Sequence, residues 1–334
     1  MKKVISIFLT AAFVLSISGC SSSEVTILGE KYSVAETTSL SFEHSKEITN
    51  KEMKKIGKLV NLTELNLFCN TITDISPAKD LTKLTKLDLG INDISDVSPL
   101  SNLTDLTVLS LWDNLHLEDI SQLSGLTNLT DLNLGATSIK DISPIGGMNK
   151  LTTLRISDNA VTDISTLSNL NNLTYLDIGG TRINDLTPIE NLTGLTTLYI
   201  NGLPVKDISS LSGLTELRVL NMSYMHVTDL SPLNNLTKLE NLNLSLNHFE
   251  NLDQLSELTS LKTLVIGHND ISDISALENL TNLEDLHLEY NEISDVTPIA
   301  KLTNLKFLSI GNNPVSDADM EWLKSQLPDC RFYE

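Results

Sequence analysis

The chain has 334 residues, of which 40% are hydrophobic but only 4% aromatic, so its apolar content is mainly aliphatic. Acids outnumber bases by 43 to 23, which gives a formal net charge of -20. No run rich in Lys or Arg follows the first three residues, so the sequence lacks the basic patch that binds a nucleic-acid backbone. We therefore expect no nucleic-acid partner.

The N-terminus has the pattern of an export signal. Lys2 and Lys3 precede an apolar run over 4–17 that is too short to span a bilayer, and small residues follow it, so residues 1–19 are predicted to be a secretory signal peptide. The segment ISGC, ending at Cys20, resembles a bacterial lipobox. That resemblance implies cleavage before Cys20, a diacylglyceryl group on its sulfur, and anchoring to the bacterial cell membrane facing the extracellular side. The alternative is an ordinary signal peptide followed by an incidental cysteine.

Two segments precede the main body of the chain. Residues 20–34 begin with small polar residues and are interpreted as a lipidated tether, and residues 35–61 as an N-terminal cap. In this cap, 38–42 alternates like a strand. Thr49 stands three residues before Glu52, the spacing of a capping box, which predicts a helix. The apolar residues expected to be buried by this helix are Met53, Ile56 and Leu59.

Residues 62–313 form twelve repeats, each opened by a leucine, at intervals of 22 residues except for one of 23. The unit reads LxxLxLxxNxIxDIxPLxxLxx, as in LTKLTKLDLGINDISDVSPLSN at 84–105. This pattern resembles the leucine-rich-repeat signature, and in detail the 22-residue, internalin-like class of bacterial repeat proteins. The resemblance covers about four-fifths of the chain. It implies an α/β repeat solenoid: a curved leucine-rich-repeat horseshoe with a parallel β-sheet on its concave face. The opening leucines are Leu62, Leu84, Leu106, Leu129, Leu151, Leu173, Leu195, Leu217, Leu239, Leu261, Leu283 and Leu305.

The apolar positions explain how such repeats stack. The fourth residue of every unit is leucine and the sixth is Leu, Ile or Met, so both point inward from a short strand with period two. Each unit then buries its apolar face only against its neighbours. Residues 314–334 are predicted to close the stack with a helix and a short strand, with Cys330 and Phe332 toward the core. Cys69 and Cys330 are about eleven strand spacings of ~4.8 Å apart, too far for a disulfide.

Two polar columns run through the repeats. The ninth position carries asparagine in eight units, where its amide satisfies backbone groups in the turn. Thr137 and Thr181 can replace that function, but Leu203 and Met225 cannot, so those turns need water or another partner. This departure is either ordinary drift or a region relaxed for binding.

The thirteenth position carries aspartate in eleven units and Asn251 in the twelfth. A column of acids suggests calcium, but aspartate before Ile-Ser is also a turn former that accepts its own following N–H groups. Because Asn251 fills the same role without a charge, we favour the turn.

Strand phase predicts a binding surface. The third, fifth and seventh residues of each unit point away from the core onto the concave face, and the eighth lies at its rim. Seven of the thirteen aromatic residues beyond the signal peptide fall there. Exposed Tyr and Trp on a rigid sheet are typical of binding hot spots. The candidate ligand-binding residues are Phe68, Trp112, Arg155, Tyr175, Tyr199, Asn201, Asn221, Tyr224, Asn243, His287, Tyr290 and Phe307.

Partner chemistry follows from the composition of that face. Tyr175, Tyr199 and Tyr224 fall in three successive units and are expected to form a diagonal stripe, with neighbours roughly 8 Å apart, among uncharged asparagines. The face is acidic toward both ends. We expect a monomer that binds a protein ligand; the alternative is a glycan, whose rings would stack on the tyrosines.

Catalysis has no support in the sequence. A Gly-rich phosphate loop, a CxxC pair, an HExxH motif and a nucleophile elbow are all missing, so we expect neither an enzyme nor a cofactor. His226 and His248 share one repeat position in adjacent units, followed in that column by Asp270. A metal clip is geometrically possible there, but unselected surface histidines are commoner, and no metal site is assigned.

Overall fold

The computed structural model describes residues 23–334, so the predicted signal peptide and Cys20 lie outside the described residues. The chain divides into two units, the first ending at Val161 and the second spanning Thr162–Glu334. Within 23–334, no helix combines the length and the apolar character needed to cross a membrane.

The first unit begins with an antiparallel hairpin of β1 (Glu24–Ile27) and β2 (Glu30–Ser33). Val25 and Ile27 alternate with polar residues and are buried, and β1 packs against the first helix. These residues lie inside the segment 20–34 that we interpreted as a tether. The structure corrects that interpretation for residues 24–33, which form a small hairpin packed on the first helix.

The helix α1 (Asn50–Ile56) begins where the capping box predicted. The Thr49 hydroxyl accepts the Lys51 N–H at 3.3 Å and donates to Glu52 Oε2 at 2.6 Å. That hydrogen bond to Thr49 lowers the pKa of Glu52 below its ordinary value, against the opposing effect of burial. Met53, Ile56 and Leu59 are fully buried, as expected.

Each repeat contributes one three-residue parallel strand, and the register joins equivalent residues, as Leu198 with Leu220. The strands of the first unit are β3 (Ser39–Ser41), β4 (Glu64–Asn66), β5 (Lys86–Asp88), β6 (Val108–Ser110), β7 (Asp131–Asn133) and β8 (Thr153–Arg155). Those of the second unit are β9 (Tyr175–Asp177), β10 (Thr197–Tyr199), β11 (Val219–Asn221), β12 (Asn241–Asn243), β13 (Thr263–Val265), β14 (Asp285–His287), β15 (Phe307–Ser309) and β16 (Arg331–Tyr333).

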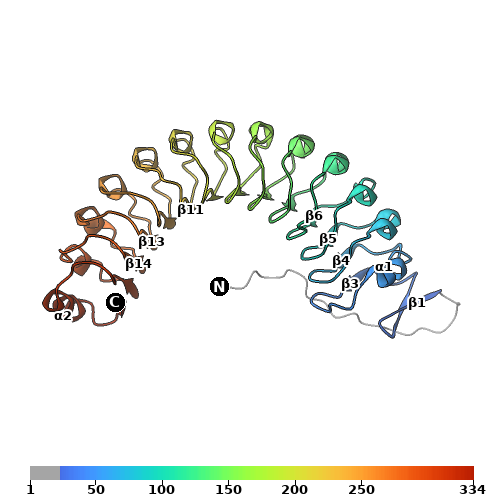
Figure 1. The fold of residues 1–334 in the computed structure, drawn as a ribbon, viewed down its shortest axis with the longest axis horizontal. Coiled ribbons are helices and arrows are strands. Elements are labelled where there is room, and N and C mark those ends of the chain that lie inside the picture. The colour runs from blue at the N-terminus through green and yellow to red at the C-terminus, as the bar shows by residue number, and fades with distance from the viewer. Residues whose placement is uncertain (1–22) are drawn as a thin grey trace. The chain divides into compact units, whose positions relative to one another are not determined.

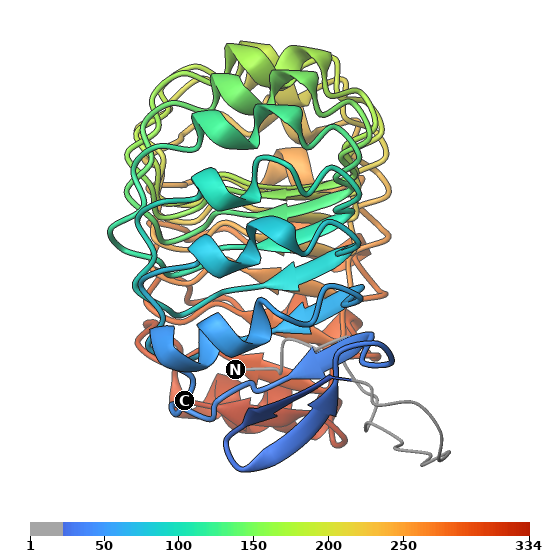
Figure 2. The same ribbon diagram turned by 90° about the vertical axis from the view of Figure 1, so that its right-hand side faces the viewer.

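The returning arc of each repeat carries a short 3₁₀ helix. In both units the strands lie on the concave side and these helices on the convex side (Figure 1), and each layer of the stack shows one strand and one short helix (Figure 2). They are η1 (Ser76–Asp80), η2 (Ser98–Leu100), η3 (Ser121–Gly125) and η4 (Ser143–Gly147) in the first unit, and η5 (Ser165–Asn169), η6 (Thr187–Ile189), η7 (Ser209–Leu211), η8 (Ser231–Leu233), η9 (Asp253–Leu255), η10 (Ser275–Asn279) and η11 (Ile299–Lys301) in the second.

The core is the column of aliphatic side chains between the strands and these helices. Leu198 and Ile200, the fourth and sixth residues of their repeat, are fully buried, as are their equivalents in nearly every other unit. The predicted α/β leucine-rich-repeat solenoid, with a parallel sheet on the concave side, is confirmed within each unit.

In the eight repeats that carry asparagine at the ninth position, its side-chain amide connects the turn to the preceding one. Asn269 donates to the Ile266 carbonyl of its own repeat at 3.0 Å and to the Leu244 carbonyl of the preceding repeat at 3.1 Å. Its Oδ1 accepts the Phe249 N–H at 3.1 Å. Thr137 and Thr181 keep the first of these bonds with their hydroxyls, as expected.

The aspartate column closes turns. Asp207 Oδ1 accepts the Ser209 N–H at 2.9 Å, and Asn251 makes the equivalent bond to the Asp253 N–H at 2.7 Å. Backbone and hydroxyl hydrogen bonds from Ser209 lower the pKa of Asp207 below its ordinary value. The equivalent bonds lower the pKa values of Asp185 and Asp273.

The second unit ends in the predicted cap. Helix α2 (Asp317–Gln326) begins after Ser316, whose hydroxyl accepts the Asp319 N–H, and β16 pairs with β15. Cys330 and Phe332 are only half-buried, rather than directed fully into the core, because this last strand has no further repeat to cover it. Burial raises the pKa of the Cys330 thiol to about 11, and both Cys69 and Cys330 are free.

The packing predicts that Leu198→Asp lowers the free energy of unfolding by about 3 kcal/mol or more, because it buries an unpaired carboxylate. Thr197→Asp is the matched control, since Thr197 faces outward on the same strand, and it should cost less than about 1 kcal/mol. Urea unfolding followed by circular dichroism measures both. Equal losses would contradict the assigned strand phase.

The turn carboxylates predict a pH effect. Their pKa values are lowered on folding, so their contribution to stability is present above the ordinary Asp pKa of 3.8 and is lost as pH falls through the lower folded value. A triple variant, Asp185→Asn with Asp207→Asn and Asp273→Asn, accepts the same N–H groups at any pH. Its melting temperature should therefore fall less than that of the parent between pH 7 and pH 3.

The control for this comparison carries the same change in charge outside the column: Asp80→Asn, Asp105→Asn and Glu257→Gln, all at exposed positions. If the control variant and the column variant lose the same stability between pH 7 and pH 3, general charge repulsion rather than turn closure accounts for the acid sensitivity.

Candidate functional site

Two features of each repeat direct side chains toward solvent. Along a strand such as β10, Leu198 points inward, so Thr197 and Tyr199 point outward. After the strand, the eighth residue of all twelve repeats adopts a left-handed backbone, with φ between +49° and +71°. Glycine is favoured in this region, yet Tyr224 and Tyr290 occupy it and are 62% and 50% exposed.

In the first unit, Phe68 and Trp112 form an aromatic pair although they are two repeats apart. Their rings are nearly parallel, at 7°, with centroids 6.1 Å apart. Gly90 occupies the equivalent position in the repeat between them. A Cβ on Gly90 would be 3.0 Å from Phe68 Cδ2. His44 packs edge-on against Phe68 at 5.1 Å. Trp112 is 38% exposed, so it lies outside the apolar core.

Two ion pairs join neighbouring strands on this face of the first unit. Arg155 Nη1 is 3.0 Å from Asp131 Oδ1 on the neighbouring strand, and Lys86 Nζ is 2.7 Å from Glu64 Oε1. Burial raises the pKa of Asp131 above its ordinary value even though Arg155 acts to lower it. In the free protein, the Arg155 guanidinium is therefore already paired with Asp131.

In the second unit, the structure brings together two of the three stripe tyrosines. The Tyr175 and Tyr199 rings have centroids 5.7 Å apart, on adjacent strands. Tyr224 lies at the rim instead, where its ring is 5.9 Å from His226, and its Cδ1 is 4.0 Å from the position of a Cβ on Gly202. The left-handed backbone of Tyr224 accounts for this difference, because it turns the side chain away from the strand direction.

The stripe is followed by amides rather than charges. Asn201 lies over Gly179, where a Cβ would come within 2.6 Å of Asn201 Oδ1. Asn221 and Asn243 occupy paired positions on β11 and β12. Each is half-buried on the outward face of its strand.

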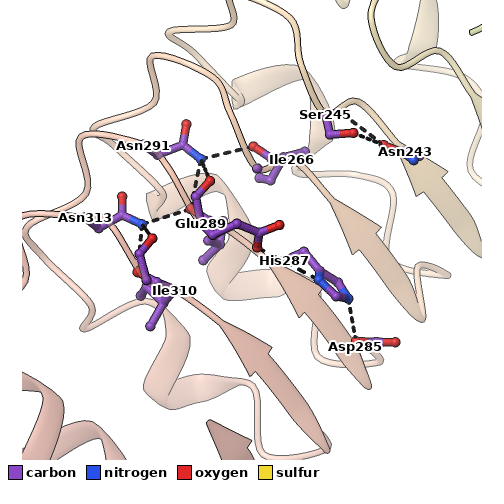
Figure 3. A network of polar contacts seen from close by, with 12 residues as sticks. Asn243, Ser245, Ile266, Asp285, His287, Glu289, Asn291, Ile310 and Asn313 are labelled. Carbon is purple, nitrogen blue, oxygen red and sulfur yellow. Dashed lines mark hydrogen bonds and ion pairs between the residues drawn. The ribbon is translucent and has the colours of Figure 1, made fainter. Parts of the chain in front are cut away.

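The C-terminal end of this face is a titratable cluster (Figure 3). His287 Nε2 is 3.1 Å from Asp285 Oδ1, and His287 Nδ1 is 3.9 Å from Glu289 Oε2. The Phe307 ring lies 5.1 Å from the imidazole. At the rim beside this cluster, Tyr290 stacks on His268 with centroids 4.2 Å apart.

The repeat containing Met225 shows how the missing ninth-position asparagine is replaced. Asn247 of the next repeat accepts the Met225 N–H at 3.1 Å, and the following His226 takes a left-handed φ of +59°. His226 stacks on His248 at 5.6 Å, and His248 Nδ1 is 3.1 Å from an oxygen of Asp270. Among residues 23–334, no group of three or more His, Cys, Asp or Glu side chains is arranged to hold a metal ion.

Sequence reasoning missed the glycines that shape this face. The seventh residue is glycine in five repeats, at Gly90, Gly135, Gly179, Gly267 and Gly311, and a neighbouring side chain lies over the first four of them. The over-lying residues are Phe68 on Gly90, Trp112 on Gly135, Asn201 on Gly179 and Glu289 on Gly267. The signal was present in the sequence as glycine recurring at an outward position.

Comparison with known proteins agrees with this geometry. An internalin of Listeria monocytogenes has a similar structure, with 35% sequence identity, a TM-score of 0.82, and coverage of 91% of this chain and 89% of that one. A leucine-rich-repeat protein of Leptospira interrogans shares the fold at 24% identity and a TM-score of 0.74, covering 84% and 80% of the two chains. No curated protein sequence matches.

The ectodomain of an Arabidopsis thaliana membrane receptor kinase, solved in complex with Casparian strip integrity factor 2, shares the fold at 23% identity and a TM-score of 0.70. That match covers 84% of this chain and 39% of the receptor chain. The family described as leucine-rich repeats (2 copies) matches residues 60–102, 82–125, 104–147, 127–169, 149–191, 171–213, 259–301 and 281–325. Because these matches cover more than half of the residues, the chain belongs to the leucine-rich-repeat family.

Proposed function

We propose that the protein is exported, anchored to the outer side of a bacterial cell membrane by lipid on Cys20, and binds a protein partner through the outward strand residues and rims of its repeats. The observation that carries the binding proposal is the exposure of aromatic rings held by the stacked repeats, chiefly Trp112, Tyr224 and Tyr290. Such rings lose little conformational entropy on binding and supply large contact areas.

The similar structures support a binding role rather than catalysis. The plant receptor ectodomain that shares this fold was solved with Casparian strip integrity factor 2 bound. We propose that this chain acts in the same general way, as a monomeric scaffold for recognition and not as an enzyme. The 35% identity to the Listeria internalin supports a bacterial surface location.

A glycan is the second candidate ligand, and a specific feature of the second unit favours it. Tyr175 and Tyr199 pack side by side and are followed by Asn201, Asn221 and Asn243, without a charged residue on the intervening outward positions of β10, β11 and β12. Aromatic faces next to amides suit the apolar face and the hydroxyls of a sugar ring. Binding that requires the Tyr175–Tyr199 pair and ignores salt would favour this candidate.

The two tryptophans provide a matched test of the protein-binding proposal. Trp112 lies beyond β6 and Trp322 on α2, with similar exposures of 38% and 40%. As a binding hot spot, Trp112 should cost ~2 kcal/mol or more of binding free energy when replaced in Trp112→Ala. Trp322→Ala should leave the affinity for the partner unchanged. The partner is first captured on residues 23–334. Titration calorimetry then measures its affinity for the parent and for both variants.

Added salt supplies a second readout in the same experiment, because the acidic ends of the face should make a protein partner bind less tightly as ionic strength rises. Equal affinity of the parent and Trp112→Ala, together with loss of affinity in Trp322→Ala, would show that the partner does not bind the strand face at Trp112.

The anchoring proposal rests on Cys20 alone. Cys20→Ala should move the protein out of the membrane fraction or leave it unprocessed, because no sulfur remains to be acylated. Cys69→Ala is the control and should leave the fractionation unchanged, since Cys69 is a free, half-buried cysteine in the first unit. Detergent-phase partitioning of a cleaved Cys20→Ala protein would show that lipid on this cysteine is not the anchor.

A further inference from the structure

Two neighbouring repeats of the second unit carry the same Asn-x-Ser segment at the end of the strand. In β11, Asn221 Oδ1 accepts the Ser223 N–H at 3.1 Å and the Ser223 hydroxyl at 2.9 Å. In β12, Asn243 Oδ1 accepts the Ser245 N–H at 3.0 Å and the Ser245 hydroxyl at 2.8 Å. Asn221 and Asn243 are register partners across the two parallel strands.

These bonds fix the orientation of both side-chain amides. A backbone N–H can only donate, so the atom that accepts it must be the carboxamide oxygen, and the NH₂ group points the other way. Neither Nδ2 donates a hydrogen bond to any residue in the part of the chain that the structure describes. Two parallel NH₂ groups are therefore presented at the outward face, with their oxygens already occupied.

The serine hydroxyl makes these two amides different from a related one in the first unit. Asn133 has the same strand position, but Gly135 follows it two residues later, so Asn133 Oδ1 accepts only an N–H, at 3.1 Å. Asn221 and Asn243 are each held by two bonds to a single serine, and a second bond restricts rotation about the last side-chain torsion. The serines thus hold amides that a single backbone bond would leave freer.

Uncharged side chains surround these two amides on the strand face. The outward positions of four successive repeats carry no charge, and they are Thr197, Tyr199, Asn201, Val219, Asn221, Ser223, Asn241, Asn243, Ser245, Thr263, Val265 and Gly267. An acid lies on each flanking strand, Asp177 on β9 before this stretch and Asp285 on β14 after it. An anionic group would be repelled by these carboxylates, and the side-chain oxygens of Asn221 and Asn243 already accept hydrogen bonds from the serines.

We propose that Ser223 and Ser245 are positioning residues. They hold the amides of Asn221 and Asn243 so that the central outward face of the second unit takes an uncharged segment of the protein partner, whose main-chain carbonyl oxygens accept the two NH₂ groups. This rests on the proposed function, because it names the part of a protein partner that the same surface recognises. Fixed donors bind without the entropy loss of ordering their side chains.

The positioning role is tested without a partner, by NMR relaxation of the side-chain amides in the full chain. Ser223→Ala with Ser245→Ala should lower the order parameters of the Asn221 and Asn243 NH₂ groups, whereas Ser223→Thr with Ser245→Thr, which keeps both hydroxyls, should restore them. The Asn133 amide is the internal control and should not change. Unchanged order parameters in the alanine variant would overturn the positioning role.

The recognition role is tested with a displayed library of 12-residue peptides selected on the full chain. We expect uncharged peptides to dominate and to weaken on the order of tenfold with Asn221→Asp plus Asn243→Asp, which removes both donors at nearly constant shape. The serine-to-alanine variant should weaken them less, and the serine-to-threonine variant should not.

The outcomes separate this inference from the proposed function. Selected peptides that depend on Tyr199 but not on Asn221 or Asn243, or that are rich in Lys and Arg, overturn the inference and leave the binding surface in place. A library that yields no peptide, or a neutral glycan that binds through the same amides, overturns the assignment to a protein segment. Peptides that bind independently of Trp112 and of Tyr199 overturn the proposed function as well.

Discussion

The buried leucine at the fourth position of each repeat sets the direction of every other strand residue. Successive side chains of a strand point to opposite faces. Because Leu198 points into the core, Thr197 and Tyr199 on either side of it point outward. A shift of one residue would expose the leucine column and bury polar side chains. The outward face can therefore vary in sequence without any change in the stack beneath it.

The polar columns stabilise the turns that connect these strands, and the aspartates among them account for eleven of the 43 acidic residues without a ligand. Asparagines such as Asn269 join backbone groups of two successive repeats, and aspartates such as Asp207 close the turn before each 3₁₀ helix. Asn251 performs the aspartate's role without charge. The acids on the outward strand positions are a separate set, and only those bear on the choice of partner.

Periodicity allowed the repeats, the capped helix α1 and the terminal helix α2 to be predicted, because each depends on spacing within one repeat or one helix. The hairpin of β1 and β2 was hidden by its two short strands, whose only apolar alternation is Val25 with Ile27 before the turn. Cys330 is half-buried because a terminal strand lacks a covering neighbour, which no local pattern shows.

At the candidate site, phase predicted which residues face outward but not which of them touch. Phe68 reaches Trp112 across two repeats because a glycine stands between them, and Tyr224 departs from the tyrosine stripe because its backbone is left-handed. The contact of His287 with Asp285 depends on rotamers along a single strand. These are properties of side-chain packing between repeats, and a repeat consensus averages them away.

The central claim is that the aromatic rings of the outward face are exposed and available for contact with a partner, and are not part of the buried core. Acrylamide quenching of Trp112 fluorescence tests it most directly, in a Trp322→Phe variant that leaves Trp112 as the single tryptophan. The account predicts ready quenching and an emission maximum at long wavelength, consistent with 38% exposure and one ring face covered by Phe68. A blue-shifted emission that acrylamide does not quench would place Trp112 in the core and contradict the outward face.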